Sequence, residues 1–273
     1  GKNPWRFDVA RNLSIDMVPD DADVLVCIDM DEILVPGWRK VIEDAWAPTT
    51  NHLSYLFAWS MQDGKPRHCF WYEKIHSRKG YIWASPVHEA LCAVHGFQDV
   101  RASVNVCLVQ HYPDGSKSRA QYLPILELGA REAPNDARIR FYLGREYSFN
   151  CRHQDAINSH KHLLNMPEAT CVRERANACL QIAGAYGALK DAKQQRDWLL
   201  KAVIEDSTQR EAWVDLADFC RITGDHLLGY WAVRKALDIP VSACDNNYLV
   251  NPDDWKQCPH DIAAITGWWG WNP

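Results

Sequence analysis

The spacing of apolar residues changes near Pro113, and the parts on either side of that residue require different folds. Before it, short runs rich in β-branched and aromatic residues alternate with turns, and a helix-like stretch, FDVARNLSIDMV, precedes the first run. The runs are DVLVCID, HLSYLFAWS, GYIWAS and ASVNVCLVQHY. After it, stretches rich in Ala, Leu, Arg and Glu show helical spacing. The sequence therefore predicts an α/β part, with Val24–Ile28 as a buried strand, followed by an all-helical part.

The composition is that of a globular chain without a general affinity for polyanions. Of the 273 residues, 47% are hydrophobic and 24% are charged, and the formal net charge is −5. This charge argues against nucleic-acid-coating or membrane-surface roles, because both need a basic face. No run reaches the roughly 18 apolar residues of a membrane span, and the ten cysteines include no CxxC pair. We expect a cytoplasmic protein with no membrane span and with reduced thiols in its core.

Small residues recur in the helical part at a nearly constant spacing. Gly144, Ala183 and Ala217 are 39 and 34 residues apart, close to a repeat period of about 34 residues. Tyr147 and Tyr186 each follow one of these small residues by three positions. A small residue at a helix crossing lets paired helices approach closely, and aromatic side chains fill the space beside it.

Over roughly residues 137–240 this pattern resembles the tetratricopeptide-repeat family. The best copy is the third, AWVDLADFCRITGDHLLGYWAVRKALDIP. We expect a connecting helix within 116–136 and a repeat domain over 137–273, in which DIAAITGWWGW opens a further helix. An unrelated helical bundle is the alternative.

A cluster of carboxylates follows the first apolar run. In VLVCIDMDEIL, the residues Asp29, Asp31 and Glu32 lie within four positions at a predicted strand end. Their repulsion is costly unless a cation or solvent relieves it, and Mg²⁺ or Mn²⁺ bridging diphosphate oxygens is a common solution. The pattern predicts a metal site, with an acidic solvated turn as the alternative.

The stretch ARNLSIDMVPDDADVLVCIDMDEILVPGW resembles GT-A-fold glycosyltransferases of the large family 2 type, in which an ARN-like helix start precedes a strand that ends in the metal-binding DxD. The resemblance implies that Asp31 binds the metal and that Asp29 reaches the donor ribose or the metal's water shell. It also implies that Arg11 and Asn12 lie beside the nucleotide. It assigns residues 1–115 to a partial GT-A-like domain of the α/β class. Because 28 residues precede Asp29, we expect the domain to be incomplete at its start or completed by another polypeptide.

A second motif, YIWASPVHEAL, resembles the Trp…VHE segment of the branch of that family that carries carboxy-terminal tetratricopeptide repeats. An inverting transfer needs a base to take the acceptor's proton, and the resemblance points to Glu89 for that role. Trp83 and His88 would then line the acceptor side. A Glu that pairs with a nearby Lys or Arg is the structural alternative.

A third motif, VQHYPDGSKSRAQY, places a histidine at the end of a β-rich run, before a turn and two basic residues. His111 resembles the late metal ligand of the family, and its imidazole suits Mn²⁺ better than Mg²⁺. Lys117 and Arg119 would stabilise the departing diphosphate of the donor. The alternative for this basic pair is the solvated first turn of the next helix.

These resemblances predict a metal-dependent glycosyltransferase that moves a sugar, with inversion, from a nucleotide-diphosphate-sugar donor such as a UDP-sugar to an unidentified acceptor. Mn²⁺ is the expected ion, with Mg²⁺ as the alternative. A competing interpretation is a catalytically inactive remnant whose tetratricopeptide array is a protein-binding scaffold. A third is a phosphotransferase or nuclease that uses the acidic cluster, which the lack of a Gly-rich phosphate loop disfavours.

Overall fold

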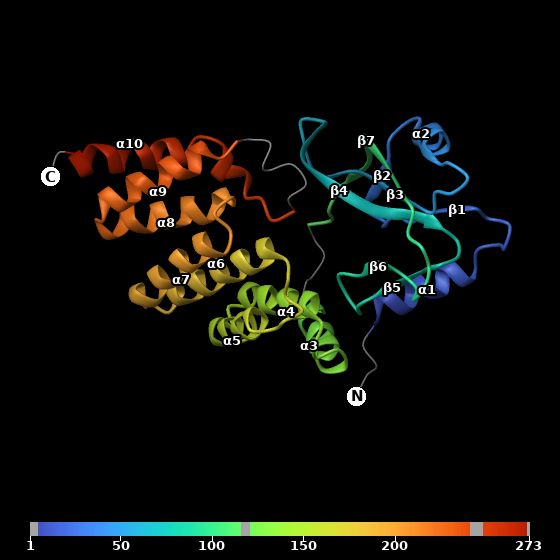
Figure 1. The fold of residues 1–273 in the computed structure, drawn as a ribbon, viewed down its shortest axis with the longest axis horizontal. Coiled ribbons are helices and arrows are strands. Elements are labelled where there is room, and N and C mark those ends of the chain that lie inside the picture. The colour runs from blue at the N-terminus through green and yellow to red at the C-terminus, as the bar shows by residue number, and fades with distance from the viewer. Residues whose placement is uncertain (1–4, 116–120, 241–247, 272–273) are drawn as a thin grey trace. The chain divides into compact units, whose positions relative to one another are not determined.

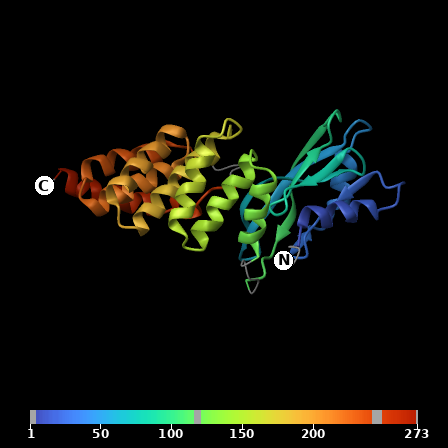
Figure 2. The same cartoon turned by 90° about the horizontal axis from the view of Figure 1, so that it is seen from below.

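The chain divides into two compact units, with the boundary between Gln121 and Tyr122. A computed structural model describes residues 5–115, 121–240 and 248–271. Within these ranges, the amino-terminal unit contains strands and two helices, and the carboxy-terminal unit is helical (Figures 1 and 2). The change of periodicity near Pro113 therefore marks a real change of architecture. The helix expected within 116–136 begins at Tyr122 and belongs to the helical unit.

The amino-terminal unit is built around one five-stranded sheet with the strand order β1-β4-β3-β7-β2. The β3–β7 pair is parallel and the other pairs are antiparallel. Register shifts along β3 bend the sheet, because each one places unequal numbers of residues on the paired strands. The elements are α1 (Phe7–Asp16), β1 (Val24–Val26), β2 (Glu32–Leu34), α2 (Trp38–Ala45), β3 (His52–Gln62), β4 (Lys65–Ser77), β5 (Tyr81–Ala84), β6 (Ala90–Ala93) and β7 (Arg101–His111).

Two apolar cores flank this sheet. In the larger one, Ile42 of α2 packs on residues of β3, β4 and β7 such as Leu53 and Ile75. In the smaller one, Ile15 of α1 packs with Leu25 of β1 and Trp83 of β5. Helix α1 and the β5–β6 hairpin thus pack together, and the acidic segment lies in the connection that leaves β1.

The first apolar run forms an edge strand, which corrects the expectation of a strand buried within the sheet. Strand β1 covers only Val24–Val26 and pairs with β4 alone, so Leu25 is buried while its two neighbours are half-buried. Its partner β4 is the longest strand, and its polar sequence KPRHCFWYEKIHS gave no strand signal. The mostly antiparallel sheet also differs from the parallel arrangement that buries a strand on both faces.

The carboxy-terminal unit is an array of antiparallel helix pairs that follow one another along the chain (Figure 2). Each helix packs against the next, and α4, α6 and α8 also contact one another in series. Its elements are α3 (Tyr122–Glu132), α4 (Ala137–Phe149), α5 (His153–Leu164), α6 (Val172–Ala188), α7 (Ala192–Glu205), α8 (Arg210–Thr223), α9 (His226–Asp238), the 3-10 helix η2 (Pro252–Trp255) and α10 (Cys258–Trp271).

The recurring small residues occupy equivalent places in this array, which confirms a tetratricopeptide-like repeat. Gly144, Ala183 and Ala217 lie on α4, α6 and α8, and the two alanines are buried. A Cβ atom at Gly144 would come within 2.5 Å of the His160 ring, so only glycine allows α5 to approach α4 this closely. Gly224 ends α8 in the left-handed conformation that favours glycine.

The composition led to two expectations, one about membrane spans and one about the burial of the cysteines. Among the described residues, no helix is both long and apolar enough to cross a membrane. The nine cysteines described are free thiols, but only Cys179 and Cys220 are buried, and Cys151, Cys171 and Cys258 are exposed. The expectation that the cysteines lie in the core was therefore wrong for most of them.

Candidate functional site

The carboxylates that follow β1 are neutralised by cations of the chain itself. Lys74 Nζ lies 2.7 Å from Asp29 Oδ2 and 2.7 Å from Glu32 Oε1. Arg11 binds the other oxygen of Asp29 at 2.5 Å, and the Asp29 backbone N–H donates to Glu32 Oε2. Lys74 and Arg11 therefore relieve the repulsion of Asp29 and Glu32, so these two carboxylates do not need the external ion that the sequence predicted.

Burial and neighbouring charges shift the pKa values of this cluster in opposite directions. Burial raises the pKa of Asp29, but Lys74 and Arg11 outweigh it and hold that pKa below its usual value. Burial likewise lowers the pKa of Lys74, but Tyr72, Glu32 and Asp29 outweigh it, so the Lys74 pKa is raised. Both partners are therefore held in their charged forms.

Replacing Lys74 with methionine should lower the free energy of unfolding by about 3 kcal/mol, because it leaves a buried carboxylate at Glu32 without its cation. Urea denaturation at pH 7 measures this change. Adding Glu32→Gln to Lys74→Met should recover much of the loss, because the unpaired charge is removed. Lys40→Met, which breaks an exposed pair with Asp44, is the matched control and should have little effect. Equal losses in both lysine variants would contradict the structural role of Lys74.

Asp31 and His111 meet where β2 pairs with β7. Glu32 lies opposite His111 in the ladder, and the Tyr112 backbone N–H donates to the Asp31 carbonyl at 2.8 Å. This pairing brings His111 Nε2 within 3.8 Å of Asp31 Oδ2. The structure thus brings together the two residues that the resemblance named as metal ligands.

The surroundings of His111 orient its imidazole. Its Nδ1 lies 3.1 Å from the Trp59 carbonyl, and its ring stacks on the Trp59 ring with centroids 4.8 Å apart. A neutral ring that donates from Nδ1 carries its lone pair on Nε2, which faces Asp31. Metal-binding histidines often have a second nitrogen fixed in this way.

The chemistry of these two side chains fits a divalent ion, although they supply only part of a coordination shell. A carboxylate oxygen and an imidazole nitrogen both bind Mn²⁺. Within the described ranges, no three side chains of the His, Cys, Asp or Glu type lie close enough to hold an ion alone. The remaining ligands would have to be diphosphate oxygens and water, as is usual for such ions.

Arg11 connects the acidic cluster to Glu89. Its guanidinium lies 3.7 Å from Glu89 Oε1, as well as contacting Asp29, and it sits 4.7 Å from the centroid of the Trp83 ring. Burial raises the pKa of Glu89, although Arg11 opposes this. A carboxylate with a raised pKa is better suited to accept a proton near neutral pH. Glu89 follows a loop in which Ser85 and His88 both have positive φ, a conformation that costs free energy in residues other than glycine.

The other predicted site residues are engaged in packing or hydrogen bonds, or lie outside the described residues. Asn12 donates to the Trp83 carbonyl and accepts from the Trp83 backbone N–H, so its amide joins α1 to β5 and is occupied. Trp83 is buried in the smaller core, and His88 is half-buried. Lys117 and Arg119 lie outside the residues that the structure describes.

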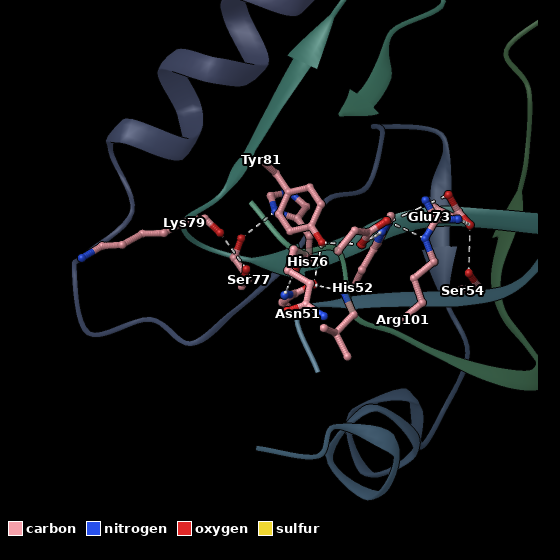
Figure 3. A network of polar contacts seen from close by, with 12 residues as sticks. Asn51, His52, Ser54, Glu73, His76, Ser77, Lys79, Tyr81 and Arg101 are labelled. Carbon is pink, nitrogen blue, oxygen red and sulfur yellow. Dashed lines mark hydrogen bonds and ion pairs between the residues drawn. The ribbon is translucent and has the colours of Figure 1, made fainter. Parts of the chain in front are cut away.

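A second polar network fixes the β5–β6 hairpin to the sheet (Figure 3). Tyr81 of β5 donates to Asp99 at 2.6 Å, and Asp99 also contacts His52, which is buried, and Arg101, which is exposed. Arg101 continues the network to Glu73. Sequence reasoning missed this network because its members come from four separate segments. Its position supports the hairpin whose strands flank the loop that carries Glu89.

A separate groove of about 540 Å³ lies on the face of the helical unit formed by α4, α6 and α8. The segment Tyr248–Asp254 forms one of its walls and is held to the array by side-chain contacts. Tyr248 donates to Glu174, while Trp255 Nε1 and the Asn251 backbone N–H donate to Glu211. This face of the array therefore already holds a further segment of the chain, made of the non-helical residues 248–251 and the start of η2.

Stability of the helical unit should fall as the pH rises from about 4 to about 7. Burial, together with repulsion from Asp215, Glu211 and Asp253, raises the pKa of Asp254 from 3.8 to about 7. Between these values the folded chain binds more protons than the unfolded chain, so raising the pH favours unfolding. Asp254→Asn should flatten this profile and raise the free energy of unfolding at pH 8 by about 2 kcal/mol.

Urea denaturation followed by helical circular dichroism at pH 5 and pH 8 measures this effect. Asp197→Asn, which makes the same change on an exposed position of α7, is the control and should leave the pH profile as in the wild type. An Asp254→Asn profile as steep as that of the wild type would refute the assignment.

The chain matches no protein-family model and none of the curated proteins. Similar solved structures include two crystal structures of MamA. They are 15% and 17% identical, with TM-scores of 0.40 each, and the matches cover 55% and 58% of this chain and 78% and 96% of MamA. A structure of pilF from Pseudomonas aeruginosa is 12% identical with a TM-score of 0.41, and the match covers 54% of this chain and 65% of that one. Likeness at this level carries no inference about function, and the tetratricopeptide-like arrangement rests on the helix packing described above.

Proposed function

We propose that the amino-terminal unit takes part in metal-dependent glycosyl transfer from a nucleotide-diphosphate sugar. The observation that carries this proposal is the meeting of Asp31 and His111 across the β2–β7 pair, 3.8 Å apart. The two side chains come from distant parts of the sequence and present an oxygen and a nitrogen ligand to one place. A divalent ion bound there would neutralise charge on the departing diphosphate.

The remaining residues have separate roles in this proposal. In an inverting transfer, the acceptor oxygen bonds to the anomeric carbon as the bond from that carbon to the diphosphate breaks. The diphosphate leaves with the electron pair, and the acceptor proton passes to Glu89. Arg11 orients Glu89 and Asp29 through its two ion contacts. Lys74 keeps Asp29 and Glu32 in place.

Calorimetric titration of the protein with UDP-glucose and GDP-mannose, in manganese and in chelator, tests this proposal. Binding of either donor in manganese and its loss in chelator is the expected result. Equal affinity under the two conditions would contradict a role for a metal at Asp31 and His111.

A second function is favoured by an independent observation, the groove of the helical unit. Because that face already holds residues 248–255 of the chain, we infer that the array is a scaffold that binds a polypeptide partner. This role does not require the amino-terminal unit to be active. A protein that binds a peptide partner but no nucleotide sugar would have this function alone.

A further inference from the structure

The groove contains a buried carboxylate oxygen that has no hydrogen-bond donor among the described residues. Glu211 is only 4% exposed, and its Oε1 accepts from Trp255 Nε1 at 2.8 Å and from the Asn251 backbone N–H at 3.2 Å. Its Oε2 is buried and accepts no hydrogen bond from any residue that the structure describes. A buried acceptor in this state is costly unless a ligand supplies the donor.

Further acceptors line the same groove. Asp215 follows Glu211 by one helical turn and also lines the groove, as does Asp254, which is 4% exposed. The Oδ1 atom of Asn177 on α6 is also buried, with no donor in the described part of the chain. Protein atoms packed around its carboxylate, with repulsion from Glu211 and Asp218, raise the pKa of Asp215, although the residue as a whole is exposed. The carboxylates therefore repel one another, and an added positive charge would relieve that repulsion.

The charge of the groove is unevenly distributed. Among its described lining residues, Arg145 is the only Lys or Arg, and it comes from α4. Its guanidinium lies between 5.6 and 5.9 Å from the ring centroids of Phe141, Tyr142 and Phe149. Glu211 and Asp215 belong to α8, so the acidic groups lie toward the other end of the array. A ligand that matches this pattern carries its positive charge at the α8 end.

The size of the groove favours an organic cation over a metal ion. As noted above, the described part of the chain has no three metal-ligand side chains close enough together to hold an ion. A volume of about 540 Å³ instead admits several amino-acid side chains. The ammonium of lysine and the guanidinium of arginine both offer the several donors that these acceptors lack.

We propose that this groove binds a basic peptide segment, with a lysine or arginine side chain entering between Glu211, Asp215 and Asp254. The proposal rests on the scaffold role of the helical array and specifies its partner. The peptide would lie beside residues 248–251, which show how the same face holds non-helical chain. Its cation would donate to Glu211 Oε2 and pair with the neighbouring carboxylates.

Selection of random nonapeptides displayed on phage against the whole protein tests the proposal. We expect the bound peptides to be enriched in lysine or arginine at one position. Replacing that residue with glutamine in a synthetic copy should lower the affinity at least about tenfold, because a charged pair buried at an interface is replaced by a neutral group. Asp215→Lys should lower the affinity of the protein for the basic peptides by a similar factor.

Controls separate this proposal from the more general scaffold role. Asp197→Asn on the exposed face of α7 should select the same peptides as the wild type. Circular dichroism of Asp215→Lys checks that the array stays folded, and Asp215→Asn offers a milder variant that should reduce the affinity in the same direction. Selection of neutral or acidic peptides would refute the cationic ligand and leave the scaffold role standing. Selection of no peptide would refute both.

Discussion

Replacing Asp31 with asparagine should abolish the manganese-dependent binding of a nucleotide sugar, with a loss of affinity of at least about 100-fold. The amide keeps the size of the side chain but removes the negative charge that lies 3.8 Å from His111 Nε2. Changing a residue that only supports a metal ligand already costs about 10- to 100-fold in metal affinity. Losing a direct ligand should cost more. Titration with UDP-glucose in manganese measures the change.

The same variants also distinguish a metal site from an ordinary ion pair between Asp31 and His111. Two ligands of one ion act together, so His111→Gln should match Asp31→Asn, and the double variant should lose no more than either. Manganese should also raise the melting temperature of the wild type and of neither variant, since binding to the folded state stabilises it. Asp44→Asn, which alters an exposed pair with Lys40, is the control. Variants that are less stable without metal, yet still respond to manganese, would identify a structural ion pair.

Local sequence signals predicted the elements whose packing depends on neighbouring residues. The β-branched and aromatic runs became β3, β5 and β7, and the helical pattern before the first run became α1. The spacing of Gly144, Ala183 and Ala217 located three helices of the array, because close helix contact requires small residues at regular intervals. Each of these signals is contained within one segment or one repeat.

Features that depend on contacts between residues far apart in the sequence could not be predicted from local patterns. Strand β4 was not predicted because its buried Lys74 and His76 break the alternation of apolar and polar residues that marks a half-buried strand. Lys74 lies 45 positions from Asp29 and 42 from Glu32, so the sequence does not indicate that it neutralises them. The sequence predicted a metal site at the acidic cluster partly because it does not show that Lys74 and Arg11 pair with these carboxylates.

The candidate site shows the same division. The DxD-like segment and the late histidine were predicted through family resemblance, but their contact depends on β2, a strand of three residues that is too short to recognise. Arg11 was expected beside the nucleotide, and the structure places it between Asp29 and Glu89. In the helical groove, Glu211 and Asp215 are one turn apart on α8, whereas Asp254 comes from a later segment that only the fold brings near.

Glu89→Gln should separate the chemical step of the proposed transfer from donor binding. Glutamine keeps the shape of the side chain but cannot take the proton that an attacking acceptor oxygen releases. Transfer should therefore fall by about 10²- to 10⁴-fold, the range expected when a general base is lost. Donor affinity in manganese should stay close to that of the wild type, because Asp31 and His111 are unchanged.

The contact with Arg11 provides the alternative explanation that this experiment must exclude. If Glu89 only positions Arg11, its replacement should disturb Asp29, which Arg11 also binds, and donor binding should weaken along with transfer. The pH profile gives a second readout. Because burial raises the pKa of Glu89, wild-type transfer should decline below that pKa as the carboxylate becomes protonated, and the residual activity of Glu89→Gln should lack this decline. Glu43→Gln, in an exposed pair with Arg39, controls for the loss of a carboxylate elsewhere. Wild-type turnover in Glu89→Gln would refute the catalytic role, and weakened donor binding would make Glu89 a positioning residue.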